Sequence, residues 1–439
     1  MRSNFLNDRE QMSTALKIES DRVPVPALAR GPRTVRVALA GCGTVGGELV
    51  RMLHHGADET CARHGLRFRL MRVLVAHGGR PRPDELDRAL LTTDLDAFLA
   101  ADADVVVEAI GGIEPALTIA RAALARGRRL VTANKALVAA HGPELAALAR
   151  RHGGRLDFES AVGGGIPVVR TLRESLSLTG ITAVRGILNG TTNYVLSRLE
   201  DGWTFADALA DAQARGFAEA DPSRDVSGED AADKLRILAW LAFGTEPARL
   251  DVRRRGLGDG ADRLARAARA LGGAVRLVAE AARVPEGIAA SVEPVLVAAG
   301  GDLGRTRDEE NLVVVETAWN GRIRLAGPGA GGGPTASALL GDMVRSAKRH
   351  RAPAHAAAPA VPDRRAHAWA IAVDRGASAE EALRATLDRV EVEVDRIARG
   401  EGTSVMRTVP TPWPRIGLAL RVLEVQGLSP AVLRVDPGA

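Results

Sequence analysis

Apolar and polar positions alternate at the start of the first regular region, and the spacing then becomes helical. Val35, Val37 and Leu39 lie on one face of a predicted strand that runs into Gly41, and residues 45–53 follow with the spacing of an amphipathic helix. Further strands are predicted at residues 70–76, 104–109 and 130–132, and helices at 84–91, at 114–126 and up to residue 150. This alternation predicts an α/β fold, with a Rossmann-type doubly wound parallel sheet over residues 34–155.

A second region, residues 156–350, has a less regular pattern. Strands are predicted at 290–297 and 311–316, and a glycine-rich loop at 327–333 leads into a predicted helix at 335–348. We expect an α+β domain here, which would carry the catalytic groups and the dimer contact. Residues 351–365 are rich in Ala and Pro and are predicted to form a linker.

The last region, residues 366–439, is predicted to be a small separate module. Strands at 368–373, 392–398, 404–409 and 431–435 and helices at 379–390 and 414–425 follow each other in the order βαββαβ. That order is the ferredoxin-like arrangement. At the other end, residues 1–33 are polar, lack periodicity and contain three prolines, so we expect a disordered extension there.

Composition narrows the class of protein. A chain of 439 residues is too long for one core, so several domains are expected. The net charge of +5 is modest, and the chain has no nucleic-acid-binding motif. Two cysteines exclude a disulfide framework, the N-terminus lacks the apolar core of a secretion signal, and no run of about 18 apolar residues occurs. We expect a soluble, cytoplasmic protein with neither nucleic acid nor membrane as a partner.

A glycine-rich segment joins the first predicted strand to the helix after it. Its residues are Gly41, Cys42, Gly43, Thr44, Val45 and Gly46. In such a segment the first glycine makes a tight turn, the second lets the backbone approach a pyrophosphate, and the third lets helix and strand pack closely. A merely structural turn would use the same residues. The position between a strand and a helix favours dinucleotide binding.

The end of the second predicted strand bears on cofactor choice. An NAD site usually has an acidic residue there, which holds the ribose 2′-hydroxyl. Here the chain has Arg80 and Arg82 and no acid before Asp84. Arginines at this place favour a 2′-phosphate, so NADP is predicted, with NAD as the alternative. The alternative interpretation is that the two arginines bind no phosphate and are solvated loop residues.

Asp230 and Lys234 are four residues apart on a predicted helix and therefore share a face. Reduction of a carbonyl requires a proton donor near its oxygen, and an ammonium held by a carboxylate is suited to that task. An exposed ion pair on a helix surface has the same spacing. The spacing alone leaves both interpretations open.

Six motifs, in the same order along the chain, resemble the homoserine dehydrogenase family. They are Glu108–Gly112 with Glu114–Ala116, Val131–Leu137, Phe158–Pro167, Gly186–Tyr194, Gly216–Pro222 followed by Asp225, Gly228, Asp230 and Lys234, and Gly327–Gly332 with Pro334–Ser337. The resemblance covers residues 34–348. It implies reversible NAD(P)-dependent reduction of L-aspartate 4-semialdehyde to L-homoserine, in the biosynthesis of threonine, isoleucine and methionine.

The resemblance also implies roles for individual residues. Lys234 would be catalytic with Asp230, and Lys135 would lie between the nicotinamide and the substrate. Homoserine would be bound by Glu219 and Asp225, together with Asp230. The glycines that would contact the cofactor, besides the first glycine segment, are Gly111, Gly329 and Gly331.

A monovalent cation such as sodium is a further implication of the resemblance. Its ligands would be backbone carbonyls, which suit a hard cation. They belong to Glu159, Val162, Gly164 and Ile166. The family resemblance also implies a homodimer, formed through a sheet of the second region.

The C-terminal module resembles an ACT domain in its order of elements, but its sequence lacks a motif that is usual in ACT domains. ACT modules place a D-x-P-G-V-like turn after the first strand, whereas here Asp374 is followed by Arg375, Gly376 and Ala377. A response to threonine and a structural or dimerising role both stay open. For the whole chain, the alternatives are a dehydrogenase of a related amino-acid semialdehyde and a non-catalytic regulatory paralogue. The presence of Lys234, Asp230, Glu219 and Lys135 argues against the paralogue.

Overall fold

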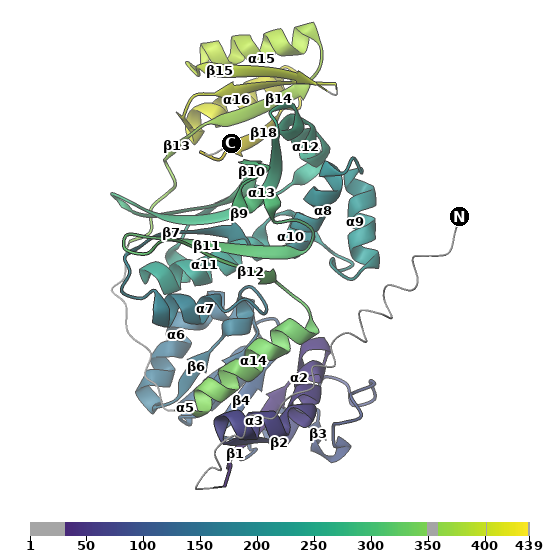
Figure 1. Ribbon diagram of the computed structural model, residues 1–439, viewed down its shortest axis with the longest axis vertical. Coiled ribbons are helices and arrows are strands. Elements are labelled where there is room, and N and C mark those ends of the chain that lie inside the picture. Colours follow the sequence, from purple (N-terminus) through teal and green to yellow (C-terminus); the bar gives the residue numbers. More distant parts are fainter. Residues whose placement is uncertain (1–30, 349–358, 401, 438–439) are drawn as a thin grey trace, which may run out of the picture.

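The computed structural model describes residues 31–348, 359–400 and 402–437, which are arranged in three tiers along the long axis of the molecule (Figure 1). The glycine-rich segment lies in the lowest tier of that view, and the C-terminal module forms the top. Of the extension expected over residues 1–33, residues 1–30 lie outside the described residues, as do residues 349–350 at the end of the second region and residues 351–358 of the predicted linker.

The lowest tier is a six-stranded sheet, parallel throughout, in the order β3-β2-β1-β4-β5-β6. Its central strands are buried on both faces, as the apolar runs in β1 and β4 require. The strands are β1 (Arg33–Ala40), β2 (Leu66–Leu74), β3 (Leu91–Thr92), β4 (Val105–Glu108), β5 (Arg129–Thr132) and β6 (Arg155–Asp157). The helices are α2 (Thr44–His55), α3 (Ala57–His64), α4 (Leu95–Leu99), α5 (Ala116–Ala125) and α6 (Lys135–His152). The predicted Rossmann-type fold is confirmed.

One predicted element of this tier is wrong. Residues 84–91 form no α-helix but a single 3-10 turn, Arg88–Leu90, capped by the carboxylate of Asp87. The chain then enters β3, where Leu91 and Thr92 pair with Val73 and Leu74 of β2. Pairing at the sheet edge requires extended backbone, so it overrides the local helical pattern. Strand β2 itself begins and ends earlier than the predicted range of 70–76.

A helix from late in the chain completes the lowest tier. Helix α14 (Gly332–Ala347) packs beside α2, and its Ala336, Leu339 and Met343 belong to the same apolar cluster as Val35 and Leu49. Figure 1 shows α14, in green, lying across the purple and blue elements. Within residues 31–348 the chain therefore crosses between the two lower tiers after β6 and again before α14.

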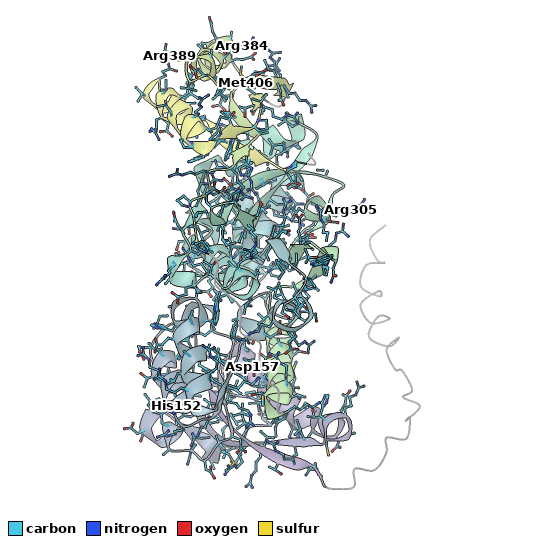
Figure 2. All side chains as sticks on the ribbon, turned by 90° about the vertical axis from the view of Figure 1, so that its left-hand side faces the viewer. His152, Asp157, Arg305, Arg384, Arg389 and Met406 are labelled. Carbon is cyan, nitrogen blue, oxygen red and sulfur yellow. The ribbon has the colours of Figure 1, made fainter. Side chains whose placement is uncertain are left out.

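An ionic cluster joins these two crossings. Arg345 of α14 lies 2.7 Å from Asp157 at the end of β6, and Asp342 accepts a hydrogen bond from the backbone N–H of Glu159 at 2.7 Å. Burial, and the neighbouring charge of Asp157, raise the pKa of Asp342 to about 7. Figure 2 shows Asp157 beside α14 in the lower part of the molecule.

The middle tier is a twisted antiparallel sheet in the order β12-β11-β7-β9-β10, with β8 beside β10. Helices α8, α11 and α12 pack against it. The strands are β7 (Ile181–Ile187), β8 (Val252–Arg254), β9 (Gly273–Val284), β10 (Gly287–Ala298), β11 (Glu310–Thr317) and β12 (Gly321–Pro328). The helices are α7 (Val168–Arg170), α8 (Gly190–Glu200), α9 (Phe205–Ala214), α10 (Ser223–Val226), α11 (Glu229–Phe243), α12 (Ala261–Ala270) and α13 (Asp302–Arg305).

The top tier has the predicted order βαββαβ. Its elements are β14 (Trp369–Asp374), α15 (Ala377–Arg389), β15 (Val394–Gly400), β16 (Thr403–Thr408), α16 (Trp413–Val425) and β18 (Ala431–Val435), with a short ladder of β13 (Ala366–His367) and β17 (Thr411–Pro412). Strand β18 pairs with β10 through Val295 and Leu296. The sheet of the module is thus continuous with the middle sheet.

Buried charges reinforce the junction between the middle and top tiers. Asp363, whose side chain is 0% exposed, lies 2.9 Å from Arg365 and 3.4 Å from Arg253. Arg434 of β18 lies 2.8 Å from Glu280 of β9. The guanidinium of Arg253 also stacks on the rings of Trp369 and Trp413. No described helix has the length and apolar content to cross a bilayer.

Candidate active site

The glycine-rich segment between β1 and α2 has the geometry that its sequence predicts. Gly41 has a positive φ of +93°, and a Cβ at that position would lie 2.5 Å from the carbonyl oxygen of Ala109. A Cβ on Gly46 would lie 2.0 Å from the carbonyl oxygen of Gly41. A Cβ on Gly43, in contrast, would meet nothing within 4 Å. The first and third glycines are therefore needed for packing, whereas the space over the second is open to a ligand.

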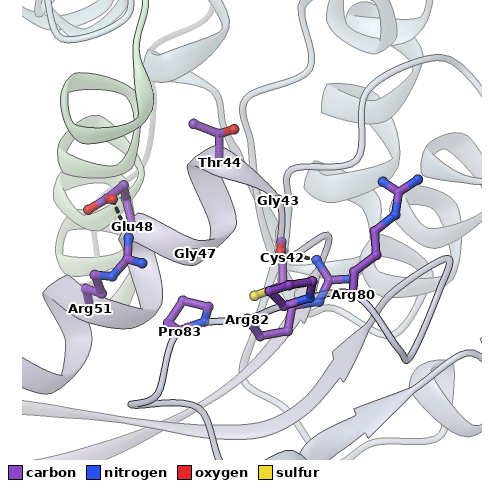
Figure 3. A pocket seen from close by; sticks show the side chains of 10 residues that line it. Cys42, Gly43, Thr44, Gly47, Glu48, Arg51, Arg80, Arg82 and Pro83 are labelled. Atoms are coloured by element: carbon purple, nitrogen blue, oxygen red, sulfur yellow. Dashed lines mark hydrogen bonds and ion pairs between the residues drawn. The ribbon is translucent and has the colours of Figure 1, made fainter.

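A pocket of about 480 Å³ lies over this segment (Figure 3). Its walls are Cys42, Gly43, Thr44, Gly47, Glu48, Arg51, Arg80, Pro81, Arg82 and Pro83. Figure 3 shows Glu48 and Arg51 of α2 on one side and Arg80 and Arg82 on the other. The structure thus places both predicted arginines beside the glycine segment.

The two arginines differ in what they contact. Arg82 donates hydrogen bonds to the carbonyl oxygens of Cys42 and His77, the second at 3.0 Å, and so holds the glycine segment against the loop after β2. Arg80 is exposed in the wall of the pocket. Of the two, Arg80 is therefore the more exposed in the pocket wall, and Arg82 supports the loop.

Glu108, which sequence reasoning did not single out, organises the next loop. Its side chain is fully buried, and Oε1 accepts hydrogen bonds from the backbone N–H groups of Ile110 (2.8 Å) and Gly111 (3.3 Å), while Oε2 accepts one from Thr132. An acid directly after the apolar run of β4 was the available signal. This loop lies beside the glycine segment, where the strand order of the sheet reverses, and ligands bind at that place in doubly wound sheets.

Lys135 is the first residue of α6. Asn134 caps this helix by accepting a hydrogen bond from the N–H of Leu137 at 3.0 Å, and its amide donates to the carbonyl oxygen of Gly112 at 2.6 Å. The ammonium of Lys135 then lies 3.0 Å from Oδ1 of Asp230 in the middle tier. The contact joins the lowest tier to the candidate catalytic residues of the middle tier.

Asp230 and Lys234 are both buried on α11, and Lys234 Nζ lies 2.8 Å from Asp230 Oδ2. The same ammonium donates to the carbonyl oxygen of Leu188 at 2.7 Å. Burial acts to raise the pKa of Asp230, but the charges of Lys234 and Lys135 outweigh it and hold that pKa well below its usual range. Burial likewise acts to lower the pKa of Lys135, and Asp230 raises it overall. Asp230 is thus a carboxylate held between two ammonium groups.

Asn189 is a second functional residue that sequence reasoning missed, although it lies inside one of the motifs. Its Nδ2 donates to Asp225 Oδ1 at 2.7 Å and to Asp230 Oδ2 at 2.9 Å, and its Oδ1 caps α8 by accepting from the N–H of Thr192. Asn189 therefore fixes both carboxylates relative to α8. The structure brings together Lys135, Asn189, Asp225, Asp230 and Lys234.

Glu219 is not part of this group. Its side chain is exposed, and its backbone carbonyl accepts a hydrogen bond from Gln213 at 3.1 Å. Its predicted contact with homoserine stays a prediction.

Two further loops meet at the glycine segment. A Cβ on Gly332 would lie 3.1 Å from Thr44 Cγ2, and one on Gly164 would lie 2.7 Å from the carbonyl carbon of Gly329. The loop that carries Gly329 and Gly331 therefore contacts α2 on one side and the loop of the predicted cation ligands on the other. The carboxylate of Glu159 accepts hydrogen bonds from the N–H groups of Val169 (2.7 Å) and Arg170 (2.9 Å), which shapes that second loop.

Two sequence profiles match the chain, one on each side of the first crossing. The profile described as "Homoserine dehydrogenase, NAD binding domain" matches residues 41–159, and the profile described as "Homoserine dehydrogenase" matches residues 167–344. The homoserine dehydrogenase of Mycobacterium tuberculosis (strain CDC 1551 / Oshkosh) is 42% identical over 323 residues, which are 72% of this chain and 73% of that protein. The chain belongs to the homoserine dehydrogenase family.

Other members of the homoserine dehydrogenase family are also similar to this chain in sequence and in structure. The Bacillus subtilis protein is 38% identical over 321 residues, which are 73% of this chain and 74% of that protein. A crystal structure of a homoserine dehydrogenase from Thiobacillus denitrificans has a TM-score of 0.81 and 31% identity, and the match covers 93% of this chain and 100% of that one. Its coverage shows that the likeness extends beyond the residues matched by the two profiles.

Membership of the homoserine dehydrogenase family makes the chain an NAD(P)-dependent oxidoreductase. One further structure, a hyperthermophilic archaeal homoserine dehydrogenase, is a complex with NADPH; it has a TM-score of 0.63 and 26% identity, and the match covers 73% of this chain and 99% of that one. The open space at Gly43 and the pocket beside it fit such a dinucleotide.

Proposed function

We propose that the described cluster around Asp230 carries out the family reaction on L-homoserine and L-aspartate 4-semialdehyde, with Lys234 as the proton donor to the carbonyl oxygen. The observation that carries this proposal is the arrangement of Lys234 itself. An ammonium has three N–H donors, and two of them are directed at Asp230 and at the carbonyl of Leu188. The third is available for the oxygen of the substrate.

In this mechanism Asp230 positions the proton donor and does not transfer a proton itself. Its lowered pKa keeps it a carboxylate at neutral pH, so it holds Lys234 and Lys135 in place. The nicotinamide, when bound, supplies the hydride that is added to the aldehyde carbon. Lys234 gives its proton to the oxygen as that carbon is reduced, and takes it back in the direction of homoserine oxidation.

The substrate carries an α-ammonium and an α-carboxylate, so its site needs both signs of charge. Asp225 is half-buried and held by Asn189, which suits the α-ammonium group. Lys135 is 40% exposed at its side chain and lies at the boundary of the two tiers, which suits the α-carboxylate or the reacting end beside the nicotinamide. Glu219, whose exposed side chain is not part of this cluster, is the other candidate for binding the α-ammonium group.

The test is an assay of the purified full-length chain with L-homoserine and NADP+ or NAD+, in which formation of reduced cofactor is followed by absorbance. Turnover with homoserine supports the proposal. Turnover only with another amino-acid alcohol would assign the chain to a related semialdehyde. Cofactor binding without turnover of any such substrate would favour a non-catalytic paralogue. The expected cellular role is the biosynthesis of threonine, isoleucine and methionine.

For the cofactor, we propose a preference for NADP over NAD. Strand β2 ends without an acid, and Arg80 lies in the wall of the pocket beside the glycine segment. A 2′-phosphate adds negative charge at this place, which an exposed guanidinium favours.

We also propose a monovalent cation at the loop of residues 159–166, held by the carbonyls of Glu159, Val162, Gly164 and Ile166. Positive φ angles at Gly163 (+74°) and Gly164 (+55°) support the proposal, because they curl the backbone of this loop. Replacing sodium by choline in the assay tests it, and the expected result is a lower rate or a lower melting temperature.

A homodimer formed through the middle sheet is our proposal for the assembly. Strand β12 is an edge of that sheet within the described residues, and Trp319 and Leu178, which are 81% and 92% exposed, lie next to each other at its end. An unpaired edge with exposed apolar side chains is an interface feature. Light scattering of the wild type and of Trp319→Ser measures whether the dimer forms and whether this end contributes.

A further inference from the structure

A buried amide lies where the loops of the candidate cofactor site meet. Asn311, near the start of β11, is 1% exposed, and neither its Oδ1 nor its Nδ2 has a hydrogen-bond partner among the described residues. A Cβ on Gly329 would lie only 2.0 Å from Asn311 Nδ2, so the amide lies directly against the backbone of that glycine. An asparagine amide has two donors and can accept at its oxygen, and burying it without partners is unfavourable.

The loop above this amide lies between α2 and the loop of residues 159–166. It follows directly after β12, in which Gly327 is the strand partner of Asn311, and it ends at Gly331, which has a φ of +105°. The residue after it, Gly332, packs against Thr44 and Glu48 of α2, and Gly164 packs against Gly329. A group that fixes the position of this loop therefore fixes the space above the glycine segment of residues 41–46.

We propose that Asn311 is a positioning residue for the dinucleotide. When the loop closes on the bound cofactor, the amide of Asn311 forms hydrogen bonds with the peptide groups of residues 329–331. Binding thereby satisfies polar atoms that the unliganded protein leaves unpaired, and this favours the bound position of the loop. The inference rests on the proposed contact of this loop with the cofactor.

Asn311→Leu tests the proposal, because leucine keeps the size of the side chain and removes its polar atoms. We expect the Kd for NADPH, measured by fluorescence titration, to rise about tenfold, which is the effect of one lost hydrogen bond. The melting temperature without cofactor is expected to stay the same or to rise, because the unpaired buried amide is gone. A merely structural asparagine would show the reverse: a lower melting temperature with an unchanged Kd.

Ser346→Ala is the matched control. The Ser346 hydroxyl is also buried and without a partner among the described residues, but it lies near the far end of α14. The Kd is expected to equal that of the wild type, and the melting temperature is expected to stay the same or to rise, as for Asn311→Leu. An Asn311→Leu variant with a wild-type Kd for NADPH would overturn the proposal.

A double variant keeps the proposal testable if Asn311→Leu fails to fold. The φ of Gly329 lies outside the range that excludes other residues, so alanine there conflicts with Asn311 rather than with its own backbone. In Asn311→Ala with Gly329→Ala, the added methyl group occupies the space of the amide. If the double variant binds NADPH more weakly than the wild type does, the proposal is supported. If it binds NADPH with the affinity of the wild type, the proposal is overturned.

The same titrations separate this inference from the proposed function. If the wild type binds NADPH and all the Asn311 variants bind it equally well, only the role of Asn311 is wrong. If the wild type binds neither NADPH nor NADH, the proposed function and this inference are both wrong.

Discussion

Lys234 Nζ lies 2.8 Å from Oδ2 of Asp230, and the two side chains are only 11% and 7% exposed. Residues at this spacing on a helix surface commonly form a solvent-exposed ion pair that contributes little. Burial excludes that interpretation here, and the added contacts of Asp230 with Lys135 and Asn189 make the pair part of a larger cluster. Of the two interpretations that the spacing left open, the fold excludes the exposed ion pair, and the catalytic role is the one that we propose.

Lys234→Met is expected to lower kcat for homoserine oxidation by about 10² to 10⁴, because the variant keeps the stem of the side chain and removes the proton-transferring group. The Kd for NADPH is expected to stay within a factor of two. Steady-state kinetics with homoserine, together with a fluorescence titration of NADPH, measure both. Arg236→Met, on the same helix and paired with Asp233, is the control and should keep wild-type turnover. A Lys234→Met enzyme within threefold of the wild-type kcat would contradict the assigned role.

Two of the three glycines of the glycine-rich segment, Gly43 and Gly46, are expected to respond differently to substitution by alanine. Gly46→Ala places a methyl group against the carbonyl oxygen of Gly41, so it should lower the melting temperature of the free protein by several degrees. Gly43→Ala meets nothing in the free protein and should leave that temperature unchanged, while it weakens NADPH binding by at least about tenfold. Calorimetry and a binding titration on both variants check this. Equal losses of stability in the two variants would show that Gly43 is a packing residue as well.

Arg80→Ala and Arg82→Ala separate recognition of a 2′-phosphate from support of the loop. Arg80→Ala should raise KM for NADPH about tenfold or more and leave KM for NADH nearly unchanged, because only the phosphate loses a partner. Arg82→Ala should raise both constants, since it releases the carbonyls of Cys42 and His77 that position the glycine segment. If Arg80→Ala affects the two cofactors equally, the NADP preference must come from another residue of the pocket.

Local patterns were sufficient for most predicted elements and for the glycine segment, but not for the edge strand β3 or for contacts between distant residues. The alternation at Val35–Leu39 and the glycines after it depend on a few neighbouring positions, and both are found as predicted. Helix α14 was expected within the second region, yet it packs on the first sheet, because its apolar face matches that of α2, which lies about 290 residues earlier in the chain. The roles of Asn189 and Glu108 likewise appear only when β7, α11, β4 and β5 are placed side by side.

Asp363 gives a pH-dependent test of the junction that joins the C-terminal module to the middle sheet. Burial acts to raise the pKa of this carboxyl, but His367, Arg365 and Arg253 together hold it well below its ordinary value of 3.8. A carboxyl with a lowered pKa stabilises the folded state above that ordinary value, and the contribution is lost as the pH falls through the lowered pKa.

Asp363→Asn is therefore expected to lower the free energy of unfolding by about 3 kcal/mol at pH 7, because it leaves buried guanidinium groups without their charge partner. The difference from the wild type should shrink as the pH falls below the ordinary value of 3.8. Urea unfolding at a series of pH values measures it. Asp374→Asn is the control, because Asp374 is 72% exposed beside Arg263 and should change stability by less than about 0.5 kcal/mol. Equal effects of the two substitutions at pH 7 would mean that the buried charges do not hold the module to the middle sheet.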